Sequence, residues 1–286
     1  MKIANREISA HAEPFIIAEA GLNHNGSISR AFDMIKAAAD AGMDVVKFQT
    51  FKADEFCHPD DPLYKWFKAS ELPESVWPEI KACCDEHNVI FMSTPQNRSD
   101  LDILLKVGVP AVKVGSDDFA NLPLISSYGR EGLPLILSMG MSDLEDIRRA
   151  REVVDPDNTA FLLCTSQYPT RDPEARMSRL PTLADAVRPS LVGFSDHTLG
   201  VTAAAMAVAY GACIFEKHFT LDQKLEGPDH EWACTPKMLR EWNDAIRSAW
   251  RLRGDAGLTL TPTEAEQKRK YQRKAGSKIR GVAGCK

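Results

Sequence analysis

The sequence predicts a (β/α)8 barrel, and three observations support this fold. Short runs rich in β-branched and aromatic residues recur eight times, and each is followed by a stretch with helical periodicity. The two kinds of segment alternate in strict order, whereas an open doubly wound sheet typically has about five or six strands. The length of 286 residues suits one such barrel, which commonly takes about 250 residues.

The expected strands are mostly apolar, and turn residues separate them from the helices. They lie at residues 15–21, 45–50, 90–94, 111–116, 134–140, 160–166, 191–198 and 213–220. The expected helices begin near residues 29, 75, 98, 121, 143, 178, 201 and 236. The longest gap, 51–72, carries Pro, Asp and aromatic residues and predicts a long loop over the barrel top. Its Lys65, Trp66 and Phe67 are interpreted either as a lid or as packing.

The two ends of the chain differ from the repeats. Residues 2–9 (KIANREIS) predict a small hairpin around Asn5 and Arg6, which we expect to plug the bottom of the barrel. Residues 261–286 contain eight Lys or Arg against two Glu. We therefore expect a barrel domain over 1–260 and a flexible basic tail over 261–286, with partner binding by the tail as the alternative.

Composition narrows the class of protein. Apolar residues make up 44% and charged residues 26%, and the net charge is −5, so nothing global favours nucleic acid or an anionic membrane as a partner. No apolar run reaches the roughly 20 residues of a membrane span, and residues 1–13 lack the apolar core of a secretory signal. The seven cysteines show no CxxC spacing. We expect a cytoplasmic protein with reduced thiols.

In this fold the active site forms at the carboxyl ends of the strands, and here those ends are polar. Side chains alternate along a strand, so Lys47, Lys113 and Glu216 are expected to face the barrel mouth. Burying them is costly unless they pair or bind a ligand. Lysines and hydroxyls suit an oxyanion. The candidate cradle consists of Lys47, Thr94, Lys113, Ser116, Ser138 and Ser195. The alternative is a structural network in which the lysines pair with Glu19 and Glu216.

Two histidines close the last two expected strands, in the sequences SDHT and EKHF. Adjacent strands lie about 5 Å apart, so His197 and His218 are able to reach one cation. Neutral imidazole suits Mn, Fe, Co and Zn. The alternative is a structural, hydrogen-bonded histidine pair. His24 is interpreted as a turn residue because Gly26 follows it, and Cys164 is expected in the core. No P-loop, GxGxxG or GxSxG motif is present at a strand end.

Taken in order, the strand-end motifs resemble the sialic acid synthase (N-acetylneuraminate synthase) family. The matching segments are 17–26 (IAEAGLNHNG), 46–50 (VKFQT), 93–95 (STP), 112–116 (VKVGS), 121–125 (NLPLI), 138–141 (SMGM), 164–170 (CTSQYPT), 193–198 (GFSDHT), 216–219 (EKHF) and 227–230 (GPDH). The resemblance implies a homodimeric enzyme that condenses phosphoenolpyruvate with an aldose, usually a mannosamine-type N-acetylated sugar. The products are a nine-carbon 2-keto-3-deoxy acid and phosphate, and the cofactor is a divalent metal, Mn or Mg.

The same resemblance assigns roles to residues. His197 and His218 would hold the metal, and the six cradle residues would bind phosphoenolpyruvate. Glu19, Tyr168 and Asp229 would face the sugar. Glu216 would lie beside the reacting centre, and either Glu19 or Glu216 would stabilise the developing cation and handle protons.

Two features depart from the family pattern. Many members read Ser-Gly-Glu where this chain has Ser116, Asp117 and Asp118, which predicts a different sugar contact. Members usually carry a C-terminal antifreeze-like domain, and residues 268–286 do not resemble one, so we expect either a short variant or a fragment. Two alternatives stay open: an enzyme that makes an eight-carbon keto-deoxy acid, and a non-catalytic sugar-binding barrel.

Overall fold

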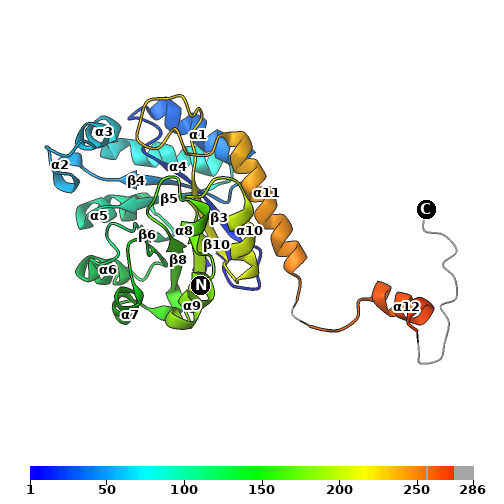
Figure 1. Ribbon diagram of the computed structural model, residues 1–286. Helices are drawn as coiled ribbons and strands as arrows, with labels where there is room; N and C mark the ends of the chain where they lie inside the picture. Colours follow the sequence, from blue (N-terminus) through cyan, green and yellow to red (C-terminus); the bar gives the residue numbers. More distant parts are fainter. Residues whose placement is uncertain (256, 274–286) are drawn as a thin grey trace. The chain divides into compact units, whose positions relative to one another are not determined.

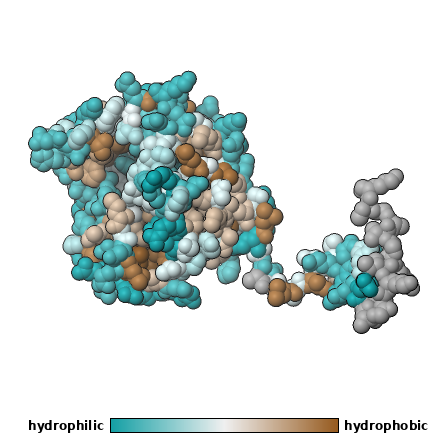
Figure 2. Space-filling view, viewed as in Figure 1, coloured by the Kyte–Doolittle hydropathy of each residue, from teal (hydrophilic) through white to brown (hydrophobic). Residues whose placement is uncertain are grey.

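The computed structural model describes residues 1–255 and 257–273 (Figure 1). The chain divides into two compact units, Met1–Arg253 and Gly254–Lys286. No helix within the described ranges is both long and apolar enough to cross a lipid bilayer. On the face drawn in Figure 2, hydrophobic residues form small groups among hydrophilic ones.

Eight parallel strands form the barrel, as the sequence predicts. They are β3 (Phe15–Gly21), β4 (Val45–Thr50), β5 (Ile90–Pro95), β6 (Val112–Val114), β7 (Leu135–Ser138), β8 (Thr159–Cys164), β9 (Leu191–Ser195) and β10 (Ile214–His218). Their hydrogen-bonded order is β5-β4-β3-β10-β9-β8-β7-β6. The two outer strands of this order, β5 and β6, contact each other and complete the circle.

A helix follows each strand and covers the outside of the barrel (Figure 1). These helices are α1 (Ile28–Asp40), α4 (Trp77–Glu86), α5 (Arg98–Val107), α6 (Leu122–Gly129), α7 (Leu144–Glu152), α9 (Arg179–Val187), α10 (Thr202–Ala209) and α11 (Pro236–Arg253). Residue types that favour helix N-caps begin two of these helices. The Ser27 side chain accepts the amide of Arg30 at the start of α1, and the Asp143 side chain accepts amides at the start of α7. The first helix, α1, packs beside the last barrel helix, α11.

The barrel has two apolar layers. One fills the space between strands and helices and includes Trp77 and Trp242. The other lies inside the barrel and includes Phe15 and Ile17. Full burial of each large apolar side chain contributes roughly 1.5–3 kcal/mol.

The predicted N-terminal hairpin is present as β1 (Lys2–Ile3) and β2 (Arg6–Glu7). Its turn falls at residues 4–5, because Ile3 pairs with Arg6. Ile3 and Ile8 are buried against the inner layer of the barrel, which supports the predicted plug.

Two expectations need correction, one about the loop at 51–72 and one about where the strands end. The region 51–72 contains the short helices α2 (Ala53–Phe56) and α3 (Tyr64–Ser70), and η1 (Glu74–Val76) precedes α4. Further short turns not expected from the sequence are η2 (Pro156–Asn158) and α8 (Asp172–Ala175). Several strands also end earlier than expected. The fourth barrel strand stops at Val114 because the Ser116 hydroxyl accepts the amide of Gly140 and takes Ser116 out of the ladder.

The described part of the basic tail contains a helix, α12 (Pro262–Tyr271), which the sequence reading did not expect. It begins with a capping box in which Thr261 and Glu264 bond each other's amides, and none of its residues is buried. Residues 274–286 of the predicted tail lie outside the described residues. The domain boundary at residue 260 stays a prediction.

Candidate active site

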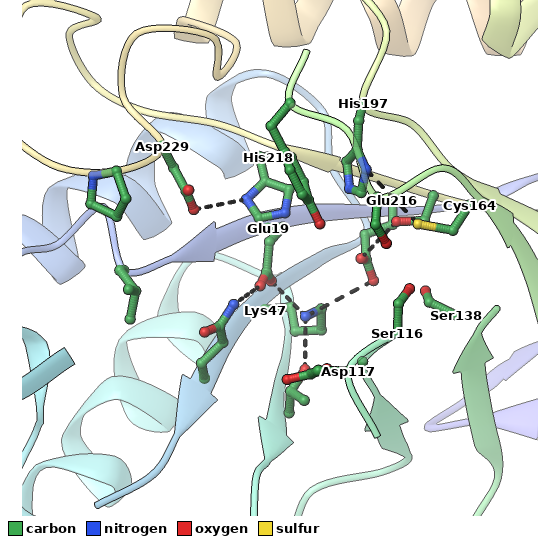
Figure 3. A pocket seen from close by; sticks show the side chains of 18 of the residues that line it. Glu19, Lys47, Ser116, Asp117, Ser138, Cys164, His197, Glu216, His218 and Asp229 are labelled. Atoms are coloured by element: carbon green, nitrogen blue, oxygen red, sulfur yellow. Dashed lines mark hydrogen bonds and ion pairs between the residues drawn. The ribbon is translucent and has the colours of Figure 1, made fainter. Parts of the chain in front are cut away.

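A cavity of about 680 Å³ opens at the carboxyl ends of the strands. All twelve predicted site residues line it: Glu19, Lys47, Thr94, Lys113, Ser116, Ser138, Tyr168, Ser195, His197, Glu216, His218 and Asp229. They come from seven barrel strands and from the segments that follow the strands. The structure therefore brings the whole set together. Figure 3 shows His197 and His218 above Glu19 and Lys47, with Ser116 and Ser138 together on one side.

Strand register explains this convergence. Glu19 on β3 is level with Lys47 on β4 and with His218 on β10, and Glu216 is level with Ser195 on β9. Residues at one level of neighbouring parallel strands point to the same face, here the barrel mouth.

Two lysines and two glutamates form a buried charged cluster at the bottom of the cavity. Lys47 Nζ lies 2.7 Å from Glu19 Oε2 and 3.9 Å from Glu216 Oε2, and Lys113 Nζ lies 3.7 Å from Glu216 Oε2. The Lys47 ammonium also donates to Thr94 Oγ1 at 2.9 Å. The lysine–glutamate pairing considered from the sequence is therefore present, at the same place as the proposed anion cradle.

The cost of burying the lysine charge is offset by nearby carboxylates at Lys47 but not at Lys113. Burial lowers the pKa of Lys47, but the carboxylates of Glu19 and Glu216 outweigh burial and raise that pKa above its usual value. Burial dominates at Lys113, whose pKa is lowered. Burial alone would raise the pKa of Glu216, but Lys113 and Lys47 hold it at about 2. The cluster therefore contains one lysine, Lys113, whose charge an incoming anion would further stabilise.

Hydroxyl groups gather on one side of the cavity that Lys113 also lines (Figure 3). The Ser138 and Ser166 hydroxyls are buried and have no hydrogen-bond partner, and Ser116 Oγ accepts the amide of Gly140 at 3.0 Å. A Cβ atom at Gly140 would collide with the hydroxyls of Ser116 and Ser166, so only glycine allows this approach. Three hydroxyls in the cavity that Lys113 also lines have the chemistry that suits an oxyanion.

The two imidazoles lie on the other side of the cavity, with ring centroids 5.4 Å apart. His197 Nδ1 lies 2.8 Å from the carbonyl oxygen of Thr165, which fixes the tautomer that leaves Nε2 as a lone-pair donor. His218 Nδ1 is buried without a hydrogen bond and lies 3.4 Å from Asp229 Oδ2.

These donors fit a divalent first-row metal, because a buried, unpartnered imidazole nitrogen beside a carboxylate suits such an ion. Within the described ranges, no three His, Cys, Asp or Glu side chains form a complete metal site by themselves. Oxygen atoms of substrate or water would have to complete the coordination.

Several cavity residues were not predicted. Gln49 donates to Glu19 Oε1 at 3.0 Å, and its place two residues after Lys47 was the available signal. Trp232 lies in the connection between β10 and α11 and packs 4.8 Å from the His218 ring. No periodicity marks that connection. Cys164 was expected in the core; it is buried, but it lines the cavity, with Sγ 3.8 Å from His197 Nδ1.

The aromatic residues of 51–72 lie at the cavity and pack on one another, as the packing interpretation expects, while the lid interpretation stays a prediction. Trp66 and Phe67 line the cavity. The Phe67 ring also packs against Phe51 and Phe56, with centroids 5.5 and 5.0 Å apart. Asp117, at the position that departs from the family pattern, lines the cavity as well. His24 accepts the amide of Gly26 through Nδ1 at 3.1 Å, as a turn residue would.

Comparisons with known proteins show which family this chain resembles. The sequence profile of the NeuB family matches residues 34–257. The N,N'-diacetyllegionaminic acid synthase of Legionella pneumophila is 38% identical over 256 residues, which cover 82% of this chain and 72% of that protein. The mouse N-acetylneuraminate-9-phosphate synthase is 29% identical over 94% of this chain and 79% of its own.

A solved structure is similar over nearly the full chain. The N-acetylneuraminic acid (sialic acid) synthetase of Leptospira borgpetersenii serovar Hardjo-bovis, in complex with citrate, superposes with a TM-score of 0.89 at 31% identity. The match covers 96% of this chain and 98% of that one.

Proposed function

Because the chain belongs to the NeuB family, we propose that it condenses phosphoenolpyruvate with an aldose to give a nonulosonic, sialic-type 2-keto-3-deoxy acid and phosphate. The supporting observation is that an oxyanion cradle and two imidazoles share one cavity with two buried carboxylates. The names of similar proteins, which are legionaminic acid and N-acetylneuraminate-9-phosphate synthases, support an N-acetylated mannosamine-like or related amino sugar as acceptor.

Phosphoenolpyruvate would occupy the cradle. Lys113 with the hydroxyls of Ser116 and Ser138 would bind its phosphate group, and Lys47 with Thr94 and Ser195 would bind its carboxylate. Both acidic groups would then be fixed, which holds C3 of the enol toward the acceptor.

The acceptor would lie above, between Glu19, Tyr168 and Asp229. C3 attacks the aldehyde carbon of the open-chain sugar, and the aldehyde oxygen takes a proton. The cation that develops at C2 is captured by water, which loses one proton and becomes a hydroxyl on C2. Phosphate then leaves by cleavage of its bond to C2, and the C2 hydroxyl loses its remaining proton to become the keto oxygen. Glu216, held ionised by the two lysines, would stabilise the cation, and Glu19 would accept the proton of the water.

A divalent metal, Mn or Mg, would be held by His197 and His218. When bound, such an ion supplies Lewis-acid polarisation of the acceptor aldehyde. The homodimer and the cytoplasmic location remain predictions from the sequence.

A phosphate-release assay over a panel of aldoses with each metal tests the proposal. We expect release with an N-acetylated hexosamine, and loss of at least about 100-fold in kcat/KM for Lys113→Met, with Lys81→Met, at a partly exposed position on α4 away from the cavity, as control. Preference for a pentose or its phosphate would support the eight-carbon product instead. A chain that binds neither phosphoenolpyruvate nor Mn in calorimetry would contradict the enzyme proposal.

A further inference from the structure

A second cavity of about 670 Å³ adjoins the first, because Met141, Cys164 and Ser166 line both. It lies outside the cradle, between the segments that follow β7 and β8. Two arginines line it, Arg176 and Arg179.

These arginines share the cavity with three carboxylates but form an ion pair with none of them. Within residues 1–255 and 257–273, neither guanidinium forms an ion pair, and that of Arg176 makes no hydrogen bond. Arg179 is half-buried; it donates to Thr165 Oγ1 at 2.9 Å, and its Nε is buried without a partner. Burial and then the nearby charge of Arg176 lower the pKa of Arg179. A half-buried cation beside a like charge is unfavourable unless an anion accompanies it.

Three carboxylates also line this cavity, but other groups of the protein already engage them. Asp143 and Asp146 accept each other's amides in the capping box of α7. Glu174 pairs with Arg171. The guanidinium N–H groups of Arg176 and Arg179 are therefore the donors of this cavity left for a ligand among the described residues. Helix α9 begins at Arg179 without a side-chain cap, which adds to the positive potential there.

We propose that Arg176 and Arg179 form a second phosphate subsite, for inorganic phosphate or a phosphate monoester. Guanidinium groups match phosphate through paired N–H donors. Ser166 stands at the boundary between the two cavities, next to the hydroxyl of Ser116. On the proposed function, the phosphate freed in the cradle would therefore have a receiving site beside it.

The binding test uses inorganic phosphate as the probe, titrated calorimetrically into the full chain with saturating phosphoenolpyruvate and no added metal. We expect phosphate to bind the wild type under these conditions. The affinity should fall by about 10-fold in Arg176→Gln and in Arg179→Gln, since each loses charge-assisted hydrogen bonds. Arg188→Gln, which alters an exposed arginine that is paired with Asp185 outside this cavity, should change it by less than about 2-fold.

Equal phosphate affinity in wild type and both variants would overturn the proposal. So would loss of phosphate binding once phosphoenolpyruvate is present, because all binding would then belong to the first cavity. Arg179 bonds Thr165, so thermal melts accompany each variant; Arg176→Gln alters an exposed side chain and keeps the test valid if Arg179→Gln fails to fold.

Kinetics separate the two sources of phosphate. For the released ion, the substitutions should weaken product inhibition by phosphate and leave the KM of an unphosphorylated aldose unchanged. For a phosphorylated acceptor, they should raise the KM of the aldose phosphate alone. Absence of turnover with every aldose would count against the proposed function, whereas the phosphate titration would still decide the subsite.

Discussion

The imidazole of His24 shows how one buried side chain sets a pH dependence. It accepts the amide of Gly26 through Nδ1, and its Nε2 is buried with no partner. Burial, helped by the charge of Arg30, lowers its pKa from 6.5 to about 4. The folded state therefore holds this ring neutral, while the unfolded chain binds a proton below pH 6.5.

His24 should cost stability as the pH falls. Between pH 6.5 and 4 the unfolded state binds more protons at His24 than the folded state does. The stability that the neutral ring contributes is therefore complete above pH 6.5 and declines toward pH 4, by about 3 kcal/mol in total. Denaturant unfolding of His24→Gln should show a flatter stability curve across this window than wild type. His87→Gln, at an exposed position, is the control, and an unchanged slope in His24→Gln would contradict the assignment.

A substitution at Gly140 tests the hydroxyls of the cradle without changing any charged residue. Alanine at this position would push against the hydroxyls of Ser116 and Ser166 and displace them from the oxyanion site. We expect Gly140→Ala to weaken phosphoenolpyruvate binding by at least about 10-fold, since charge-assisted hydrogen bonds are lost. Gly129→Ala adds a Cβ that meets only ordinary contacts and is the matched control. Unchanged affinity in Gly140→Ala would place the anion elsewhere.

At the scale of elements, a buried network ties α11 to the ends of β9 and β10, where the two histidines lie. Asp196 Oδ2 accepts the indole N–H of Trp242 at 2.8 Å and lies 3.0 Å from Lys217 Nζ, while Oδ1 accepts the amide and hydroxyl of Thr198. These side chains point away from the cavity, toward the helix layer. The network therefore fixes the strand ends from behind.

Removing one charge from this network should be costly. Asp196→Asn keeps hydrogen-bonding capacity but leaves the ammonium of Lys217 buried and unpaired, and we expect a loss of about 3–5 kcal/mol in urea unfolding. The double variant Asp196→Asn with Lys217→Met should recover part of this loss. The exposed pair of Asp185 and Arg188 gives the comparison, because Asp185→Asn should cost less than about 1 kcal/mol. Additive effects in the double variant would contradict the pairing.

The sequence predicts the elements better than their ends. The first two barrel strands have the predicted bounds, because each is an unbroken buried run that follows a turn. Later strands stop short where a strand-end side chain bonds a neighbouring segment, as Ser116 and His197 do. Strand alternation predicted that Lys47, Lys113 and Glu216 face the barrel mouth, whereas Tyr168 and Asp229 were assigned to the site only through the family resemblance. Trp232 was not predictable, because its segment shows neither helical nor strand periodicity. Only the closure of the barrel brings this side chain to the cavity.

At the scale of the whole barrel, the ends of the Met1–Arg253 unit are joined at the face opposite the cavity. Arg247 on α11 lies 2.8 Å from Asp44 Oδ2 and donates to the carbonyl oxygen of Pro14, and Arg6 of the hairpin pairs with the same aspartate. The carboxylate of Asp44 also accepts the amide of Ile16. One carboxylate thus connects the hairpin, the first barrel strand and the last barrel helix.

Arg247→Gln should loosen this junction without touching the chemistry. We expect a loss of about 2–3 kcal/mol in unfolding free energy, because a half-buried ion pair and a hydrogen bond disappear. The KM for phosphoenolpyruvate should stay unchanged at temperatures where the variant is folded. Arg251→Gln, on the exposed side of the same helix, is the control. A changed KM would show that the two ends of the barrel communicate.

The balance of two acids and two bases under the cavity has a thermodynamic consequence. A ligand with a phosphate and a carboxylate adds negative charge to a cluster of two lysines and two glutamates that is nearly neutral by itself. A cation held by the imidazoles would offset this added charge. The anion and the cation should therefore bind with positive cooperativity, and linkage requires each to tighten the other by the same factor. Titrating phosphoenolpyruvate with and without Mn, and Mn with and without phosphoenolpyruvate, should return one common factor well above 1.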